Sequence, residues 1–574
     1  MRKQLLLYFF LCACSSCYGQ NWLWGTQGES KTIHDIGEGF SITIDKLNNI
    51  YLTGYFVDTI TFGHDTITNN LYPRNDAFLV KYDSTGKLIW VRNSKTETNI
   101  TSTCRAFTSA TDFNENIYIG GSYGDSVIFY PDTLITSAES DIFITKYDNN
   151  GNVLWAKSSK SSIKYGNASC NSLSVDKKDN VYATGEYNDT LSLGVSNFYS
   201  PVGPSFYLVK YNSNGHVIWA KESNIITSKT TSTGNGLVND RYGNIYVTGT
   251  FSDSIKFGAQ LLTSKTDDFF LMKCDSNGNV IWAKDGLVAN IRGLSIGNSI
   301  CIDQNENLYV TGYFLDSISF GSHTLYSPKL YDFFVAKYDV NGNVIWAKAA
   351  TVNDTNGWYG YSINVDTNGH LYLSCAAKMN SAYINLHYGN TRLTLNNTPL
   401  DPSLFLELDT AGNFVCGNIL ASNGDDQNTV ACDKSGKYIY VGGDLVSSES
   451  YIFGKDTLTG NGGEYPFIAR WQPCSDVSQG IVPILPEKEN VTLFPNPNNG
   501  VFQLKIGHAE LVSASQPIIE VYNILGEQVL NETLKQVQGD NAINLTSQPS
   551  GIYLYRVLKE SGEPIGQGKI IIQK

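Results

Sequence analysis

The sequence is poor in the residues that most often build metal and catalytic sites. Its 574 residues include 7 histidines, which do not recur at a common position and show no His-x-x-x-His spacing. A histidine-based metal site is therefore not expected. The sequence also lacks a phosphate-binding glycine loop and a Cys/His nucleophile motif, and the eight cysteines beyond the leader include no C-x-x-C pair. We predict no catalytic residues and no cofactor.

Long hydrophobic runs are missing beyond the first twenty residues, so no membrane span is predicted. The net charge of −13 and the lack of a basic run argue against nucleic acid or anionic lipid as a partner.

The N-terminus has the features of a secretory signal peptide. Arg2 and Lys3 precede a short apolar run from Leu5 to Ala13, and a cut near Gln20 makes residues 1–20 the leader. An alternative is a lipoprotein cleavage box at Leu11–Cys14, which would make Cys14 a lipid anchor. Either alternative predicts an exported protein.

Of the 11 cysteines, three lie in this leader and eight are scattered over the rest of the chain. Their spacing shows no regular disulfide framework, so most are predicted to be small buried core residues, and any pairing stays open.

The chain is rich in Tyr (35), Phe (26) and Gly (52), and it contains a repeat. From Ser41 to Trp471 a unit of strand, Asp-led turn, strand, long connection, strand, Asn-Gly turn and strand recurs. The first hairpin occurs seven times, led by Asp45, Asp112, Asp176, Asp240, Asp303, Asp366 and Asp433. This pattern predicts an all-β protein in which helix is a minor component.

The fourth strand of the unit carries a tryptophan, at positions 90, 155, 219, 282 and 346. The sixth unit has Cys416 there instead, and the seventh unit has no fourth strand after Trp471. The missing strand matches the text around Trp24, near the N-terminus. We therefore predict that the strand of Trp24 pairs beside the strand from Phe467 to Trp471 and closes a ring.

These repeats resemble the seven-bladed SBBP-type β-propeller repeats of bacterial surface and secreted proteins. The resemblance covers residues 21–473 and implies a seven-bladed β-propeller closed by an N-terminal strand.

A linker at 474–490 is followed by residues 491–574, which do not contain the repeat. Their pattern predicts four or five short strands, enough for a small β-sandwich. They resemble the type A C-terminal sorting domain of type IX secretion cargo from Bacteroidetes. The matching residues are Pro495, Asn496, Pro497, Gly500, Tyr522, Gly526, Gly551, Tyr553 and Lys574. The resemblance implies contact with the type IX machinery, export across the outer membrane, and release or anchoring to surface lipopolysaccharide. The alternative is an ordinary immunoglobulin-like accessory domain.

Two acidic features recur in the repeats. An aspartate stands before Ser or Thr at one repeat position, in Asp58, Asp125, Asp189, Asp253 and Asp316. This pair is typical of turns, and we favour that interpretation over a ring of cation or glycan contacts. The turns led by Asp112 and Asp303 resemble the start of a calcium loop, but Ile117 and Leu308 stand where glycine is needed, so calcium is unsupported.

Three functions compete. We favour a non-catalytic binding or adhesion module for a glycan or a surface protein, located on the cell surface or secreted. Trp358 and Tyr359, outside the repeat register, are the candidate ligand contacts. The alternatives are a secreted polysaccharide lyase or hydrolase that uses the central funnel, and a ligand-free scaffold.

Overall fold

The computed structural model describes residues 22–474 and 491–574, with gaps. The gaps are 30–35, 70–72, 97–101, 162–165, 226, 228, 289–291, 353–356, 379–382, 389–390, 397–401, 421–427, 447–449, 460–462, 497, 507–517, 524–527, 535–540 and 559–563. The expected signal peptide, Cys14 and residues 475–490 of the linker lie outside the described residues. The chain divides into two compact units, Met1–Asp476 and Val477–Lys574. The described residues form strands and turns with no α-helix, as predicted.

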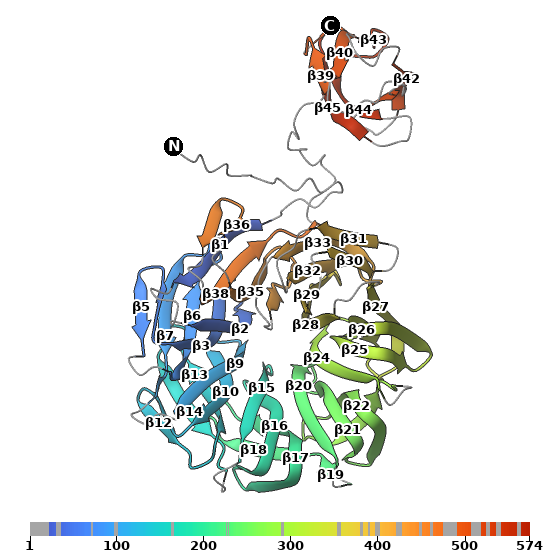
Figure 1. Cartoon of the computed structure of the whole chain (residues 1–574). Helices are drawn as coiled ribbons and strands as arrows, with labels where there is room; N and C mark the ends of the chain where they lie inside the picture. Colours follow the sequence, from blue (N-terminus) through green and yellow to red (C-terminus); the bar gives the residue numbers. More distant parts are fainter. Residues whose placement is uncertain are drawn as a thin grey trace, which may run out of the picture. The chain divides into compact units, whose positions relative to one another are not determined.

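The first unit contains seven four-stranded antiparallel arrangements, here called sheets 1 to 7 (Figure 1). Sheet 1 is β2 (Gly37–Ile44), β3 (Ile50–Val57), β6 (Asn75–Tyr82) and β7 (Leu88–Asn93). Sheet 2 is β9 (Thr103–Thr111), β10 (Ile117–Gly124), β13 (Asp141–Tyr147) and β14 (Val153–Ser158). Sheet 3 is β15 (Ala168–Val175), β16 (Val181–Leu193), β17 (Ser196–Tyr211) and β18 (Val217–Glu222). Sheet 4 is β20 (Thr231–Asn239), β21 (Ile245–Phe257), β22 (Gln260–Cys274) and β23 (Val280–Asp285).

The remaining three sheets follow the same order. Sheet 5 is β24 (Leu294–Ile302), β25 (Leu308–Phe320), β26 (His323–Tyr338) and β27 (Val344–Val352). Sheet 6 is β28 (Gly357–Val365), β29 (Leu371–Lys378), β32 (Ser403–Leu408) and β33 (Phe414–Leu420). Sheet 7 is β34 (Thr429–Cys432), β35 (Ile439–Val446), β38 (Glu464–Trp471) and β1 (Trp22–Glu29).

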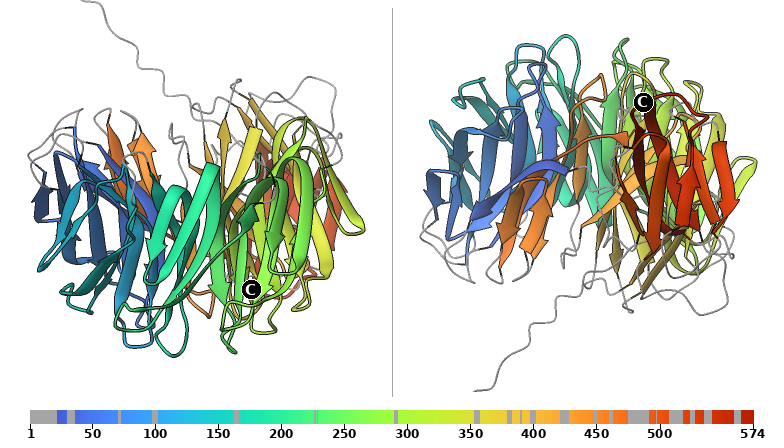
Figure 2. Two further views of the ribbon diagram at one scale, coloured as in Figure 1. Left: turned by 90° about the horizontal axis from the view of Figure 1, so that it is seen from below. Right: turned by 90° about the horizontal axis from the view of Figure 1, so that it is seen from above.

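The first strand of each sheet is the innermost, and each contacts the first strand of the next sheet around a ring (Figure 1). The succession runs β2, β9, β15, β20, β24, β28 and β34, and β34 contacts β2 again. Hydrogen bonds join neighbouring inner strands, as from Leu237 N to Ser172 Oγ at 3.0 Å. Seen from the side, the inner strands run between two opposite faces of the ring (Figure 2).

The N-terminal strand β1 pairs antiparallel with β38, the last repeat strand. Trp24 lies opposite Arg470 and Gln27 opposite Phe467, the pairing that the sequence predicted for Trp24. The same strand also pairs with β4 (Thr59–Phe62), the short strand that follows β3 of sheet 1, where Gly28 lies opposite Phe62. Because β1 bonds to both neighbours, it ties the end of the first unit to its beginning.

The long connections of the repeat contain strands of their own. They extend the second and third strands of sheets 3, 4 and 5, and elsewhere they form short hairpins. The additional strands are β4 (Thr59–Phe62), β5 (Asp65–Thr68), β8 (Lys95–Thr96), β11 (Ser126–Phe129), β12 (Asp132–Ile135), β19 (Asn224–Ile225), β30 (Tyr383–Tyr388), β31 (Thr391–Asn396), β36 (Ser450–Phe453) and β37 (Asp456–Thr459).

The repeated tryptophan joins each sheet to the next. Trp219 Nε1 donates to the Ser276 carbonyl in the following sheet at 3.2 Å. Its ring also lies on Gly278, where an added Cβ would be 3.0 Å from the indole. The equivalent pairs are Trp24 on Gly86, Trp90 on Gly151, Trp155 on Gly215, Trp282 on Gly342 and Trp346 on Gly412.

Between sheets 6 and 7 a disulfide takes the place of this contact. Cys416 stands where the other sheets have tryptophan, and it is bonded to Cys474, just after β38. The prediction that most cysteines are small buried residues holds for Cys104, Cys170, Cys274, Cys301 and Cys375. Cys416 and Cys474 are the exceptions, whose pairing the sequence left open, because the fold brings these residues, 58 positions apart, together at the seam.

The described residues of the second unit form seven strands, more than the four or five expected. One sheet is β39 (Val491–Phe494), β40 (Val501–Ile506) and β43 (Asn541–Asn544), and the other is β42 (Gln528–Thr533), β41 (Ile518–Tyr522), β44 (Gly551–Leu558) and β45 (Pro564–Ile572). Side chains from both sheets share one core that includes Phe502, Leu504, Ile519, Val557 and Ile570. Two sheets over a common core form a small β-sandwich.

Candidate functional site

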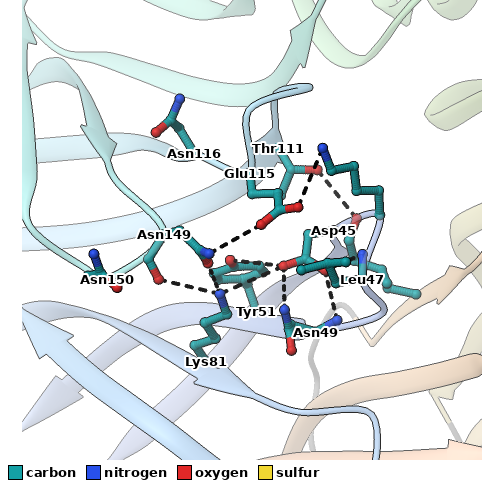
Figure 3. Close-up of polar contacts among 12 residues, drawn as sticks. Asp45, Leu47, Asn49, Tyr51, Lys81, Thr111, Glu115, Asn116, Asn149 and Asn150 are labelled. Atoms are coloured by element: carbon teal, nitrogen blue, oxygen red, sulfur yellow. Dashed lines mark hydrogen bonds and ion pairs between the residues drawn. The ribbon is translucent and has the colours of Figure 1, made fainter.

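The repeated Asp-led turn is held by a network of the same residue types in sheets 1 to 5, drawn for sheet 1 in Figure 3. Asp45 Oδ1 accepts the backbone N–H groups of Leu47 and Asn49, both at 2.9 Å. Its Oδ2 accepts the Asn49 amide at 2.7 Å and the Tyr51 hydroxyl at 3.2 Å. Lys81 lies 3.7 Å from the same oxygen and 5.0 Å from the centre of the Tyr51 ring.

This network serves the fold. Burial lowers the pKa of Lys81 and raises that of Tyr51. Burial also raises the pKa of Asp112, but hydrogen bonds from Asn116 and the charge of Lys146 outweigh it, so the pKa is below its usual value. Both carboxylate oxygens are used by protein donors, so the arrangement differs from a calcium loop, whose carboxylates bind the ion.

Asp58 and Asp125 lie at bends between strands, as turn chemistry predicts, whereas Asp189, Asp253 and Asp316 lie at register shifts inside β16, β21 and β25. Each aspartate has a positive φ, from 62° at Asp125 to 72° at Asp316. Asp is one of the few residues other than glycine that tolerate this conformation. Backbone geometry therefore explains why the residue recurs there.

The inner strands carry a repeated irregularity whose residue type varies from sheet to sheet. A β-bulge interrupts the pairing of the first two strands in sheets 1 to 6. The residue left out of register is always five positions before the repeated Asp, and these residues are Phe40, Phe107, Asn171, Asn235, Asn298 and Tyr361. A bulge re-aims its side chain, and all but Phe40 line one cavity at the centre of the ring.

This cavity has a volume of about 610 Å³ and a largely polar wall. Asn171, Asn235 and Asn298 each donate an amide N–H to a glycine carbonyl of the next inner strand, at 3.2, 3.0 and 2.8 Å. These bonds hold the three amides in place. Arg105, Glu139 and Glu186 supply the charges of the wall, and Phe107 and Tyr361 supply its rings.

A second cluster lies beside Arg105. The Tyr55 hydroxyl donates to Glu38, the Arg105 guanidinium lies 4.4 Å from the centre of the Tyr55 ring, and the ring of Phe40 lies 5.4 Å from that of Phe107. Burial, followed by the neighbouring Glu464, raises the pKa of Glu38, although the hydrogen bond from Tyr55 opposes the shift. Glu38 thus keeps its proton to a higher pH than an ordinary glutamate does.

The two predicted ligand contacts have different positions. Trp358 is fully buried in the core between sheets 5 and 6, so its prediction as a ligand contact is wrong. It stands in a strand whose alternation turns it inward. Tyr359, on the other face of β28, is half-buried and lies 4.7 Å from Tyr313 and 5.2 Å from Tyr331 between ring centres.

Sequence reasoning missed the channel residues. Their signal is the fixed spacing of five residues before each repeated Asp, at a position whose identity changes from sheet to sheet.

In the second unit the sorting-motif residues bind the last strand. Asn496 Nδ2 donates to the Lys569 carbonyl, and Asn496 Oδ1 accepts the Ile571 N–H, both at 2.8 Å. Gly500 has a φ of 102°. Tyr553 is buried and donates to the Pro549 carbonyl at 2.9 Å.

Tyr522 and Gly551 lie on the two central strands of the second sheet, β41 and β44, and Lys574 follows β45. The Arg556 guanidinium lies over the Tyr522 ring, 5.5 Å from its centre. Gly551 begins β44, and the backbone N–H of Lys574 donates to Ser550 Oγ at 3.1 Å. Pro497 and Gly526 lie outside the described residues.

The fold and motif together define an all-β protein with a terminal sorting domain. Residues 492–573 match the family of secretion system C-terminal sorting domains. This match supports a protein that is sorted by the type IX secretion system, interacts with its machinery and reaches the cell surface or the medium. No helix in the described part of the chain has the length and hydrophobicity needed to cross a membrane.

Comparisons of the whole chain show distant similarity. The chain is 26% identical over 371 residues to an uncharacterised WD repeat-containing protein of Acanthamoeba polyphaga mimivirus, a match that covers 52% of this chain and 26% of that protein.

Among solved structures, a protein of unknown function from Bacteroides caccae is 11% identical with a TM-score of 0.30, covering 61% of this chain and 92% of that one. PorZ, a surface component of the type IX secretion system of Porphyromonas gingivalis, is 11% identical with a TM-score of 0.20, covering 93% of each chain. These TM-scores support no particular fold or function.

Proposed function

We propose that the first unit is a seven-bladed β-propeller of the SBBP type and works outside the cell as a non-catalytic binding module. The inner strands contact one another around the ring, and β1 pairs with β38. By this proposal the leader at 1–20 and the sorting domain direct the propeller through a Bacteroidetes-type envelope, to be released or held on the surface.

One observation carries the binding proposal: five of the six bulge residues line one cavity, and their type varies among Phe, Asn and Tyr although the sheets around them repeat. Turn and core positions keep their residue types because packing requires them. A channel that served packing alone would need no such variation.

The wall favours a glycan over a protein segment as the ligand. Three fixed amides and the hydroxyls of Ser122 and Ser169 line the cavity beside the rings of Phe107 and Tyr361. Sugars present hydroxyl groups to such amides and apolar ring faces to aromatic side chains. The volume of about 610 Å³ is in the range of small-ligand sites.

Binding is tested by titrating the mature chain against a panel of oligosaccharides and measuring affinity by calorimetry. Asn235→Ala and Tyr361→Ala should each weaken binding by about tenfold or more, as loss of about 1.4 kcal/mol implies. Asn197→Ala, outside the cavity lining, is the matched control. If the parent binds a glycan and all three variants bind it with equal affinity, the binding site lies outside this cavity.

A second candidate is a carbohydrate-active enzyme, favoured by Glu38 alone. A carboxylic acid that stays protonated, next to the carboxylate of Glu464, is suited to general acid catalysis. The enzyme is supported if the parent releases products from a bound oligosaccharide and Glu38→Gln binds the oligosaccharide without releasing products. Unchanged oligosaccharide after prolonged incubation would support the binding module.

A further inference from the structure

The seam between sheets 6 and 7 departs from the repeat at four positions together. Sheet 5 has Asn307, Lys337 and Trp346 in its turn, third strand and fourth strand. The same positions in sheet 6 hold His370, Glu407 and Cys416, and Cys474 follows the last strand of sheet 7. These three replacements and Cys474 are residue types whose side chains bind zinc.

The fold brings these side chains to one place. Glu407 is fully buried, and its Oε2 accepts the Cys474 N–H at 2.7 Å and lies 3.6 Å from Cys416 Sγ. One ligand atom each of Glu407, Cys416 and Cys474 lies within 4.8 Å of the other two. The two sulfurs are bonded to each other in the disulfide, so the three atoms can share one ion only after reduction lets the sulfurs separate to the spacing of about 4 Å that zinc bonds of about 2.0–2.3 Å set.

His370 supplies an independent observation. Its Nδ1 lies 3.5 Å from the other Glu407 oxygen, Oε1, and 3.9 Å from Asp366 Oδ2. This nitrogen is buried and has no hydrogen-bond partner within the described residues. Its position beside the carboxylate is that of an outer-shell group, which orients a ligand by bonding to its second atom.

The charges at the seam also favour a cation. In sheets 1 and 2 the buried aspartate of the turn has a lysine 3.7 or 3.2 Å away. In sheet 6 a glutamate replaces that lysine, so two carboxylates, Asp366 and Glu407, lie near one another with His370 between them. Buried carboxylates are retained where they are paired or coordinate a metal.

We propose that, when Cys416 and Cys474 are thiols, their sulfurs and the Glu407 carboxylate bind one zinc ion, with His370 positioning the carboxylate. The ion displaces one proton from each thiol, and water fills the fourth position. Oxidation of the two thiolates by a disulfide-donating partner transfers two electrons to that partner, forms the Cys416–Cys474 bond and releases the ion. A dithiol reductant reverses the step. The seam is thus closed by a metal in the reduced protein and by a disulfide in the oxidised protein. This proposal is independent of any ligand in the channel.

The test compares the mature full-length chain in two redox states. One sample is reduced with a phosphine under nitrogen, and the other is oxidised and its thiols counted. Both are incubated with zinc, dialysed and analysed for metal. Reduced protein should retain about one zinc per chain and oxidised protein none. With cobalt in place of zinc, the reduced sample should show thiolate-to-metal charge-transfer absorption.

Variants locate the site. Glu407→Gln and the double variant Cys416→Ser/Cys474→Ser should lose the retained zinc. His370→Asn, which restores the residue of the other sheets, should weaken binding by about tenfold. Cys274→Ala, a buried thiol of sheet 4, is the control and should bind as the parent does.

Equal zinc in the reduced and oxidised parent, or none in either, would overturn the proposal, and so would zinc retained by the double cysteine variant. The comparison of redox states uses the unchanged chain, so it decides the question even if a variant does not fold.

Discussion

The indole ring of Trp24 lies on Gly86, so that a Cβ added at Gly86 would be 2.7 Å from it. Trp24 belongs to sheet 7 by its pairing with Arg470, whereas Gly86 lies in the turn between the third and fourth strands of sheet 1. The contact is the same as that of Trp219 with Gly278. The N-terminal segment therefore supplies both the outer strand of sheet 7 and its contact to sheet 1.

Replacing Trp24 by alanine should destabilise the first unit by about 3 kcal/mol, the lower end of the cost of removing a buried tryptophan. The loss should appear in the midpoint of denaturant unfolding followed by fluorescence. Leu23→Ala, an exposed position on the same strand, is the control and should change little. Equal effects of the two substitutions would contradict a specific closing contact.

Gly278→Ala should cost more stability than Gly258→Ala, although both glycines have positive φ, 78° and 59°. The left-handed backbone costs alanine about 1–2 kcal/mol at either site. At Gly278 the new methyl group would also lie 3.0 Å from the Trp219 ring, whereas at Gly258 its nearest neighbour, Val280, is 3.5 Å away. The difference between the two unfolding free energies isolates the tryptophan contact.

Reducing the Cys416–Cys474 disulfide in the presence of a chelator should destabilise the first unit by up to about 4 kcal/mol. The estimate comes from the chain entropy of a loop with a sequence separation of 58. Denaturant unfolding of oxidised and reduced protein measures it, and the oxidised sample with chelator is the control. Added zinc should restore part of the loss if the seam binds metal.

Asp268 should make stability depend on pH. Burial, and then the neighbouring Asp285, raises its pKa from 3.8 to about 7, while hydrogen bonds from Ser264 and Val288 oppose the shift. A raised carboxyl pKa means that the folded state binds the proton more tightly, so this contribution is complete below about pH 4 and is lost as the pH rises through about 7. Asp268→Asn should therefore gain in Tm relative to the parent across this interval.

Asp275→Asn is the control with the opposite sign. Burial raises the pKa of Asp275, but hydrogen bonds from Asn279 and Asn277 outweigh it and leave the pKa below its usual value. Its stabilisation is lost as the pH falls, so the substitution should cost more stability at neutral pH than in acid. Parallel pH profiles of the two variants would contradict both assignments.

Asn496→Ala should reduce export. The substitution removes the two hydrogen bonds that hold the motif turn to the last strand, β45, at a cost of about 1–3 kcal/mol in the small domain. The measurement is the share of the protein in the medium and on the surface of a type IX-competent host, with Thr533→Ala at an exposed position as the control. Full export of Asn496→Ala would show that the machinery tolerates a loosened terminal strand.

Local pattern was enough to predict the all-β class, because alternating apolar residues, Asp-led turns and Asn-Gly turns act over a few residues. The repeat also predicted the partner of the Trp24 strand. The last repeat lacks its fourth strand, and the N-terminal segment supplies an additional copy of that strand, so the two are expected to pair. The sorting motif was likewise recognised from residues such as Asn496 and Tyr553, which lie in the part matched by the family.

Long-range packing decided what the sequence alone left open. The bulges that aim Asn235 and Tyr361 into the channel depend on how two strands come into register, which no single strand records. The sequence predicted Trp358 to be an exposed aromatic residue. It is buried in the core, because β28 packs against the neighbouring strands. The disulfide and the Glu407 cluster join residues far apart in the chain, because sheets 6 and 7 pack side by side. Side-chain types follow from local rules, but their meeting points follow from how the sheets pack on one another.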